Sequence, residues 1–328
     1  MNHKRYNIGF LFGDFYGAYT ANLFYNIVNS CREYSQNFTG FGGGFLKSQS
    51  GPVLGENCNF IYDLPGQDNI DGIIVEGSIG NFIPEKSMQE FLLKYQGIPI
   101  VNIGSLLEGY NNILIDNKKG MTDLVNHLVE YHKYKNIAFI TGNEGNFDSI
   151  ERFEAYKNVL EKHGIDFNNS LVARGDFSYQ SGTKAFETLF NERKVKFDAV
   201  VCANDYMAIN VIREMKRYGL KVPDYAAVTG YDDTQECWTA KPTLTTVKQP
   251  FYELGRESVK VLVSMIEGKN PPSKTVIPTE FIIRESCGCR ASDKLSFIMN
   301  EKFVAGAPAA GELDKDLFKQ EIGETMKR

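Results

Sequence analysis

The chain has 328 residues, which is long for one ordinary domain and suits two lobes. Its hydrophobic share of 42% and charged share of 23% are typical of a globular protein that folds in water. The net charge of -5 argues against a general nucleic-acid-binding surface, because such a surface needs clustered basic residues. The apolar runs are too short to cross a membrane. Neither nucleic acid nor a membrane is therefore expected as a direct partner.

The N-terminal stretch MNHKRYNIGFLF is followed by Gly13 and Asp14, which leave its apolar run too short for the core of a signal peptide. We therefore expect a cytoplasmic protein. Of the six cysteines, only Cys287 and Cys289 are close together. Zinc-binding thiolates are usually separated by two residues and accompanied by a second pair, and the sequence shows neither feature. This spacing predicts reduced structural cysteines, with no metal and no cofactor.

Short β-rich apolar runs alternate with helical patterns along the chain. The runs expected as strands often end in residues that suit turns; they cover 6–12, 72–75, 98–103, 112–115, 136–140, 199–202 and 226–229. Apolar residues recur at helical spacing in 21–34, 121–131 and 204–218. Strand and helix repeated in this order imply parallel sheets with right-handed crossovers, so we expect the α/β fold class.

The end of the chain differs in composition. After Cys289 it becomes polar, and GAPAAG (306–311) resembles a linker. Apolar residues then form an amphipathic helical stripe, consisting of Leu313, Leu317, Phe318, Ile322 and Met326. Two interpretations stay open: an end helix packed on its own domain, or the start of a helical stalk that leads to a further module.

The glycine-rich stretch FTGFGGGFLKSQS (38–50) contains the residue types of a nucleotide-binding phosphate loop. Such a loop needs glycine directly before its Lys-Ser pair, and Leu46 precedes Lys47. The dinucleotide-binding glycine spacing is also missing. We therefore interpret the glycines as positive-φ positions in a loop after a strand over 38–41. We expect this loop near the rim of a ligand cleft or at a dimer face.

Polar side chains follow four of the predicted strands. In open α/β sheets, ligands bind at the carboxyl ends of strands. Asp14, Phe15 and Tyr16 follow the first strand, and Arg152 lies in the first turn of a helix that follows the strand over 136–140. The remaining two positions are the pairs Asn204-Asp205 and Asp232-Asp233.

Each of these residues also has a purely structural explanation. The Asn and Asp residues suit helix N-caps, and Arg152 suits a surface ion pair with Glu151 or Glu154. Together they supply a planar cation, an amide and carboxylates, flanked by aromatic rings. Those groups pair with hydroxyls, so the set indicates a pocket for a polyhydroxylated ligand.

Three stretches, CANDYMAINVIREMKRYGLKVPDYAAVTGYDD, KPTLTTVKQPFYELGRESVKVLVSMIEG and TEFIIRESCGC, resemble the effector-binding domain of the lactose/galactose repressor family, which is related to periplasmic sugar-binding proteins. The resemblance runs from about Tyr6 to Cys289. It implies a periplasmic-binding-protein-like type I fold, in which two Rossmann-like lobes with parallel sheets are joined by three crossing strands near 115–117, 245–249 and 278–281. The expected parts are an N-terminal lobe (1–115 plus 247–277), a C-terminal lobe (116–246 plus 278–290) and a linker with an amphipathic helical tail (291–328).

The resemblance places the ligand in a cleft between the lobes. The ligand-binding residues it implies are Asp14, Phe15, Tyr16, Arg152, Phe177, Asn204 and Asp232. Ala155 stands where the family pattern after Arg152 has glycine. The aromatic residues of the loops, which also include Tyr179 and Trp238, favour a sugar or nucleoside over an amino acid.

The first predicted strand begins at Tyr6, which leaves no room before it for the helix-turn-helix of a repressor. The chain is similar to sensor domains that are fused to a diguanylate cyclase, a histidine kinase or a helix-turn-helix output. The leading hypothesis is a homodimeric small-molecule sensor that acts in signalling or transcription regulation and is not an enzyme. The alternatives are an extracytoplasmic sugar-binding protein of a transporter and a sugar-processing enzyme. The adjacent Asp232 and Asp233 and the failed phosphate loop disfavour the enzyme.

Overall fold

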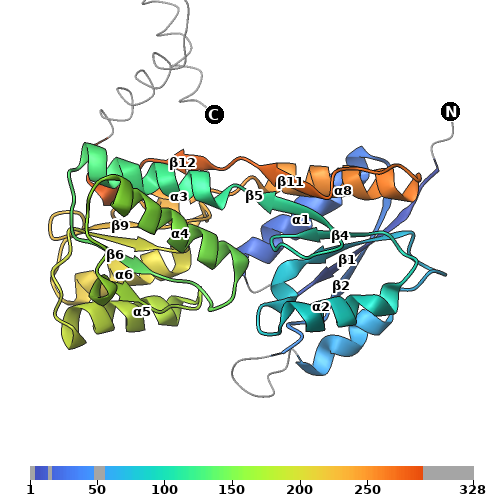
Figure 1. Ribbon diagram of the computed structural model, residues 1–328, viewed down its shortest axis with the longest axis horizontal. Helices are drawn as coiled ribbons and strands as arrows, with labels where there is room; N and C mark the ends of the chain where they lie inside the picture. Colours follow the sequence, from blue (N-terminus) through green and yellow to red (C-terminus); the bar gives the residue numbers. More distant parts are fainter. Residues whose placement is uncertain (1–3, 14–16, 48–55, 291–328) are drawn as a thin grey trace, which may run out of the picture. The chain divides into compact units, whose positions relative to one another are not determined.

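Two parallel β-sheets, each flanked by helices, form the core of the computed structural model, which describes residues 4–13, 17–47 and 56–290 (Figure 1). Both sheets belong to one compact unit. The expected α/β class with two lobes is confirmed. The predicted tail stripe and the predicted binding residues 14–16 lie outside the described residues. Among the described residues, no helix has the length and apolar character needed to span a membrane.

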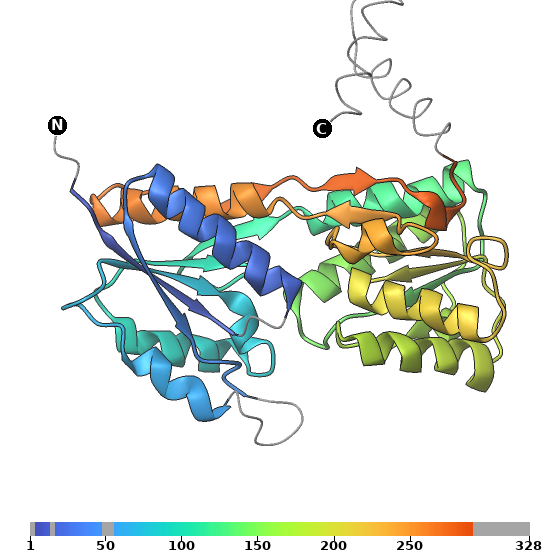
Figure 2. The same ribbon diagram turned by 180° about the vertical axis from the view of Figure 1, so that it is seen from behind.

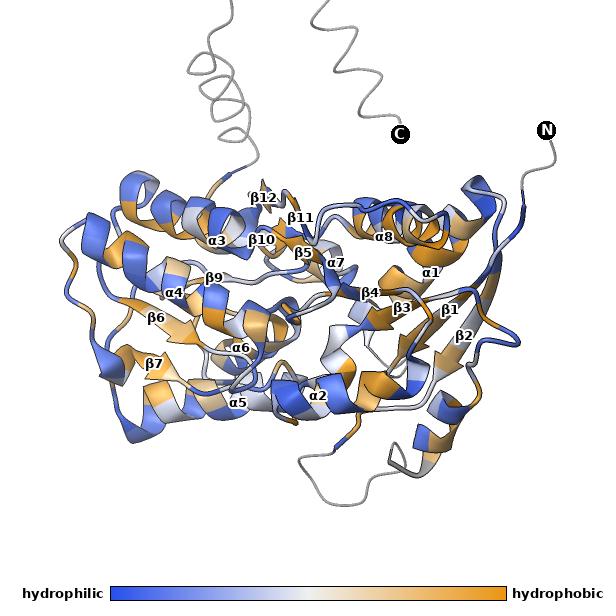
Figure 3. Ribbon diagram, turned by 45° about the vertical axis from the view of Figure 1, so that its right-hand side comes forward, coloured by the Kyte–Doolittle hydropathy of each residue, from blue (hydrophilic) through white to orange (hydrophobic). Residues whose placement is uncertain are grey.

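The N-terminal lobe contains a six-stranded sheet in which every neighbouring pair is parallel. Its strand order is β11 (Lys274–Ile277), β5 (Asn111–Ile115), β4 (Ile100–Ile103), β3 (Gly72–Glu76), β1 (Asn7–Phe12) and β2 (Asn37–Gly42). All residues of the central strands β3 and β4 are buried. The hydrophobic colouring of β1, β3 and β4 in Figure 3 shows the near-continuous apolar runs of parallel strands that are covered on both faces.

Two long helices, α1 (Ala18–Glu33) and α8 (Phe251–Ile266), lie side by side on this lobe (Figures 1 and 2). Gly255 of α8 allows their close approach, because a Cβ atom there would come within 2.7 Å of the Asn26 backbone. The remaining helical elements of the lobe are α2 (Glu85–Leu92) and the 3-10 turns η1 (Glu56–Asp63), η2 (Gly77–Gly80) and η3 (Leu93–Tyr95). Because α8 follows the C-terminal lobe in the chain, its packing here depends on the chain crossing back.

The C-terminal lobe contains a four-stranded parallel sheet in the order β7 (Val172–Ala173), β6 (Ile137–Ile140), β8 (Ala199–Cys202) and β9 (Ala227–Thr229). Its α-helices are α3 (Asn117–Asn126), α4 (Phe147–Lys162), α5 (Tyr179–Glu187), α6 (Asp205–Arg217) and α7 (Glu236–Thr239). The first-turn amides of α3, α4, α5 and α6 are each capped by a side-chain oxygen, from Asp116, Asn146, Ser178 and Asn204. Two π-helical turns, η4 (His127–Tyr131) and η6 (Thr188–Glu192), and two 3-10 turns, η5 (Asn169–Leu171) and η7 (Glu285–Cys287), complete the lobe.

Three segments cross between the lobes. The first joins β5 to α3 through Asp116 alone. The second contains β10 (Thr246–Lys248) and leads into α8, and the third leads from β11 into β12 (Glu280–Ile282). β10 and β12 pair with each other in an antiparallel two-stranded sheet. The crossing segments therefore run together at the edge of the C-terminal lobe, where they meet the site described below.

The glycine-rich stretch corrects one expectation from the sequence. Strand β2 runs to Gly42, and of the glycines at 40 and 42–44 only Gly44 has a positive φ, of 86°. The others are small for steric reasons: a Cβ atom at Gly40 or Gly42 would come within 2.8 Å of an aromatic ring, and one at Gly43 would collide with Tyr62. The predicted positive-φ role is therefore wrong for three of the four glycines.

Candidate functional site

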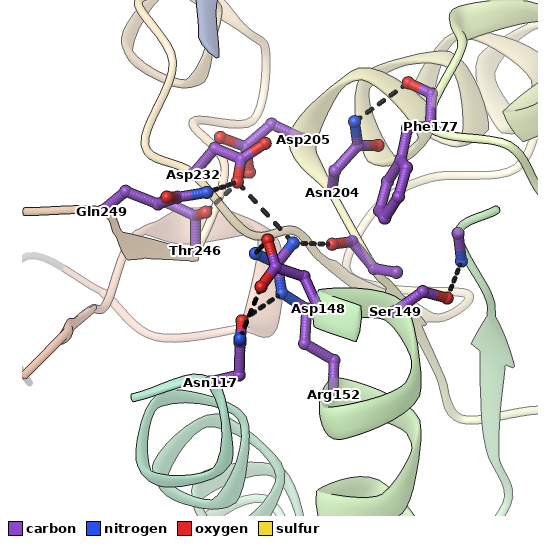
Figure 4. Close-up of polar contacts among 12 residues, drawn as sticks. Asn117, Asp148, Ser149, Arg152, Phe177, Asn204, Asp205, Asp232, Thr246 and Gln249 are labelled. Carbon is purple, nitrogen blue, oxygen red and sulfur yellow. Dashed lines mark hydrogen bonds and ion pairs between the residues drawn. The ribbon is translucent and has the colours of Figure 1, made fainter. Parts of the chain in front are cut away.

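A cluster of polar side chains lies at the carboxyl edge of the C-terminal sheet (Figure 4). Asn117 begins α3, Asp148 and Arg152 lie on α4, Asp205 begins α6 directly after β8, and Asp232 follows β9. The carboxyl ends of parallel strands meet at the same edge of a sheet, so residues distant in sequence converge there. We call these five residues the polar cluster.

Arg152 forms the centre of the polar cluster and is only 2% exposed. Its Nε donates to Asn117 Oδ1 at 2.9 Å, and its Nη1 donates to the Ala203 carbonyl at 2.7 Å. Its guanidinium also lies 3.7 Å above the ring of Tyr231. The alternative of a surface ion pair with a neighbouring glutamate is wrong. The predicted position in the first helical turn is also wrong, because α4 begins at Phe147 and Arg152 falls in its second turn.

Two carboxylates flank the guanidinium. Asp148 Oδ2 lies 3.6 Å from Nη2, and Asp232 Oδ1 lies 3.7 Å from Nη1. Asp148 also accepts a hydrogen bond of 2.8 Å from Asn117 Nδ2. One buried cation is therefore shared by two acids from different elements. Both carboxylates lie beyond ordinary hydrogen-bond distance from it.

Burial dominates the electrostatics of these acids. It raises the pKa of Asp148, against the opposing influence of Arg152 and Asn117. It raises the pKa of Asp232 to about 6, although Arg152 and a hydrogen bond from Gln249 act in the opposite direction. For Asp205, burial and the nearby charge of Asp232 raise the pKa to about 8. The cluster therefore retains protons at pH values where exposed aspartates have lost them.

The second crossing segment positions two of these carboxylates. Gln249 Nε2 donates to Asp232 Oδ1 at 2.6 Å, and Thr246 Oγ1 donates to Asp205 Oδ1 at 2.6 Å. The backbone amide of Thr234 donates to the other Asp205 oxygen at 2.9 Å. Both Asp205 oxygens are therefore occupied by the protein, which makes Asp205 a positioning group. Asp232, whose φ is 122°, presents its carboxylate toward Arg152.

Asn204 and Phe177, two more of the predicted site residues, lie together beside the cluster (Figure 4). Asn204 Oδ1 caps α6 by accepting from the Met207 amide at 3.1 Å, and Nδ2 donates to the Phe177 carbonyl at 2.9 Å. The structural explanation of Asn204 as an N-cap is thus confirmed. Phe177 has a φ of 69°, and its ring lies so close to Gly142 that a Cβ atom there would overlap it.

Other residues singled out from the sequence have different roles. Asp233 forms a buried ion pair with Arg284 at 2.6 Å. Trp238 is 64% exposed and stacks on the same guanidinium at 4.0 Å. Tyr179 donates its hydroxyl to Glu236 at 2.6 Å. The structure therefore places Asp233 and Trp238 in a structural contact with Arg284, outside the polar cluster.

Sequence reasoning missed several members of the site. Asn117 and Asp148 were not singled out, although the i,i+4 spacing of Asp148 and Arg152 is a usable signal for a pair on one helix face. Tyr19, on α1 of the N-terminal lobe, was also missed. Its pKa is raised by burial and by the charges of Asp148, Glu76 and Asp232. The Tyr19 hydroxyl therefore lies within the electrostatic reach of the cluster. Glu76 is 1% exposed and accepts from the hydroxyl of Thr20 at 2.8 Å.

Two hydrogen bonds join the lobes near the site. The Ala18 amide donates to the Tyr206 hydroxyl at 2.8 Å, and Asn146 Nδ2 donates to Asn81 Oδ1 at 3.0 Å. Each bond joins a residue of the N-terminal lobe to one beside the start of α6 or α4. Both helix starts also carry residues of the site, so contact between the lobes and the arrangement of the site are mechanically linked.

Known proteins are similar to this chain in sequence and in fold. A family described as a periplasmic binding protein-like domain matches residues 125–287. The HTH-type transcriptional regulator CelR of Thermobifida fusca is 34% identical over 200 residues, which cover 60% of this chain and 58% of CelR. The probable HTH-type transcriptional repressor ExuR of Bacillus subtilis is 31% identical over 284 residues, which cover 82% of this chain and 81% of ExuR.

Solved structures of transcriptional regulators are similar to this chain in fold. The CelR–cellobiose complex superposes with a TM-score of 0.74 at 26% identity, covering 87% of this chain and 86% of CelR. The chain spans less than two thirds of the curated CelR sequence, but four fifths of ExuR. These relatives are transcriptional regulators, so the comparisons support the regulator interpretation and not the transporter alternative. The chain belongs to the LacI family of transcriptional regulators, whose periplasmic-binding-protein-like domain it contains.

Proposed function

We propose that this chain is a sensor that binds a small polyhydroxylated ligand, in the first place a sugar, between its two lobes. The observation that carries the proposal is the buried Arg152, which is shared by Asp148 and Asp232 at the sheet edge. Carboxylates accept hydrogen bonds from sugar hydroxyls, while the guanidinium and the Tyr19 hydroxyl donate to them. The predicted residues Asp14, Phe15, Tyr16, Phe177 and Asn204 remain part of the proposed site.

The solved relative supports the ligand class, because CelR was determined in complex with cellobiose. The interlobe bonds of Ala18 and Asn146 form only when the lobes are together. A ligand that contacts both lobes would therefore favour the closed arrangement, and closure is the signal that the sensor passes on.

The proposal includes an output that is separate from the described residues. We assign the chain to a cytoplasmic homodimer that controls a helix-turn-helix, diguanylate cyclase or kinase module and does not itself contact nucleic acid. The expected division of the chain into lobes and tail belongs to the same proposal. We propose no enzymatic activity for the chain, because the relatives that it matches are transcriptional regulators.

Isothermal titration calorimetry with cellobiose, common monosaccharides and nucleosides tests the proposal. We expect saturable binding of at least one of them, with Asp232→Asn and Arg152→Lys weakening it at least tenfold. Arg213→Lys is the matched control, because Arg213 is exposed on α6 and bonds to Asn210. Absence of binding across the panel, or equal affinities for all variants, would overturn the proposal.

A further inference from the structure

Two histidines and two cysteines gather at one point of the C-terminal lobe, away from the residues assigned to the ligand. They are His127, His132, Cys287 and Cys289, and one donor atom from each lies within 4.8 Å of all the others. The histidines come from η4, which continues α3, and from the residue that follows it. The cysteines come from η7 and the two residues after it. The group therefore joins two segments about 160 residues apart in sequence, the separation of His127 and Cys287.

Two of the six donor–donor distances can be compared with the edges of a metal-centred tetrahedron, and both match. With Zn–N of about 2.0 Å and Zn–S of about 2.3 Å, a tetrahedral zinc site has N–N edges of about 3.3 Å and N–S edges of about 3.5 Å. His127 Nε2 lies 3.2 Å from His132 Nε2 and 3.7 Å from Cys287 Sγ. Both separations are within a few tenths of an ångström of the tetrahedral values.

The backbone at the histidines is wound so that both rings face this point. In an α-helix, residues three and four apart share a face, whereas residues five apart point in different directions. η4 is a π-helical turn, and the His132 amide bonds to the His127 carbonyl at 3.4 Å. The i→i+5 turn brings residue 132 back over residue 127. Such π turns occur frequently at functional sites.

The backbone at the cysteines is equally specific. Gly288 has a φ of 106°, in the region that favours glycine. A Cβ atom at Gly288 would come within 3.3 Å of the His132 ring and 3.4 Å of the Tyr134 hydroxyl. The left-handed glycine therefore lets the chain reverse between the two thiols while it passes close to the histidine.

The surroundings suit a closed structural site. Cys287 is fully buried, His127 and Cys289 are 4% exposed, and His132 is partly buried. The ring of His127 stacks on Tyr131 at 5.1 Å, and the ring of His132 stacks on Tyr134 at 5.1 Å. The Tyr134 hydroxyl also donates to the Cys287 carbonyl at 3.2 Å. Stacking against these aromatic rings limits the rotation of both imidazoles.

We propose that His127, His132, Cys287 and Cys289 bind one Zn²⁺ in a Cys₂His₂ structural site. Binding releases one proton from each thiol, so two thiolates and two neutral imidazoles surround the dication and the buried site carries no net charge. A mixed sulfur and nitrogen set with tetrahedral spacing selects zinc over hard cations. The metal cross-links η4 to η7. The sequence disfavoured zinc because one residue separates the two cysteines and no second cysteine pair accompanies them. In the structure, His127 and His132 supply the other two donor atoms.

The alternative without a metal, in which the cysteines are reduced and structural, explains some of these contacts. A hydrogen bond between two imidazoles accounts for the 3.2 Å contact, and the Cys287 thiol lies 3.3 Å from the Arg284 carbonyl, as in a reduced structural cysteine. Neither contact requires four donors to converge. The two readings differ in one measurable quantity, which is the zinc content of the folded protein.

The full chain, purified with a reductant and without a chelator, provides the test. We expect about one zinc per chain by inductively coupled plasma mass spectrometry, and release of that zinc when a mercurial titrates the thiols. After removal of zinc, Co²⁺ should give the thiolate charge-transfer and ligand-field bands of a tetrahedral site. A wild-type protein with no zinc and no Co²⁺ spectrum would overturn the proposal without reference to any variant.

Variants locate the site. Cys287→Ser and His132→Ala should reduce the bound zinc at least tenfold and abolish the Co²⁺ bands. Cys58→Ser and Cys31→Ser are matched controls, since both cysteines lie in the other lobe, on η1 and α1. Control variants that lose as much zinc as the cluster variants, or cluster variants that keep it while folded by circular dichroism, would refute the assignment.

Discussion

Replacing Arg152 by methionine tests the central feature of the ligand site. The substitution keeps an unbranched side chain of similar length but leaves Asp148 and Asp232, whose side chains are 14% and 13% exposed, without their shared cation. Removing one partner of a buried ion pair costs about 3–5 kcal/mol. The acceptors Asn117 Oδ1 and Ala203 O lose their donors as well. We therefore expect the free energy of unfolding at pH 8 to fall by about 3–5 kcal/mol.

The cost should depend on pH in a defined direction. The pKa of Asp232 in the folded protein is about 6, above its ordinary value of 3.8, so the folded state becomes less stable as pH rises between these values. Arg152 lowers this pKa, and also that of Asp148. Without Arg152 both values rise further and the loss of stability continues to higher pH. If the substitution raises the pKa of one of these acids by one unit, the stability that Arg152→Met costs is about 1.4 kcal/mol smaller at low pH than at pH 8.

Urea unfolding followed by far-ultraviolet circular dichroism at pH 5 and pH 8, without ligand, measures this difference. Arg213→Met is the control, because Arg213 is exposed, and we expect it to change stability by less than about 0.5 kcal/mol at both pH values. An Arg152→Met penalty that is equal at pH 5 and pH 8 would refute the role of Arg152 as the counter-ion of the buried acids.

Three further predictions concern neighbouring residues. Asn204→Ala should lower the free energy of unfolding by about 0.5–2 kcal/mol, as urea unfolding would show, because it removes the cap of α6 and the bond to the Phe177 carbonyl. Asn204→Asp keeps the capping oxygen but places a carboxylate oxygen against the Phe177 carbonyl, so we expect it to destabilise the protein as well. Tyr206→Phe removes the acceptor of the Ala18 amide, so small-angle X-ray scattering without ligand should show a larger radius of gyration than for wild type. Asp205→Asn should flatten the loss of stability between about pH 4 and pH 8, because the pKa of about 8 in the folded protein makes the charged form unfavourable; an unchanged pH profile of urea midpoints would contradict this.

Much of the fold could be predicted because its central strands are continuous apolar runs. The predicted strands over 6–12, 72–75 and 199–202 correspond to β1, β3 and β8 with ends shifted by at most one residue. β7 was missed because it has two residues, too few for any periodicity. The place of α8 could not be read from its helical pattern, since it packs on the N-terminal lobe only after the chain has crossed back.

The site was only partly predictable. Arg152, Asn204 and Asp232 follow strand ends, and this position is visible in the sequence. Asn117 was missed because it looks like an ordinary first residue of a helix, and its bond to Arg152 depends on the packing of α3 against α4. The histidines of the proposed zinc site were missed for a related reason, because only the π turn η4 brings His132 over His127.

The two proposed sites share their supporting segments. Asn117 begins α3 at the polar cluster, and His127 follows the last residue of that helix, about 15 Å away at 1.5 Å per residue. On the other segment, Arg284 holds Asp233 next to Asp232, and Cys287 comes three residues later. Zinc would thus cross-link the end of α3 to η7. The opposite ends of these two segments carry Asn117, which belongs to the polar cluster, and Arg284, which bonds to Asp233, the neighbour of Asp232. The C-terminal lobe would then move as one rigid body during closure, and the adjustment would fall on the bonds of Ala18 and Asn146 between the lobes.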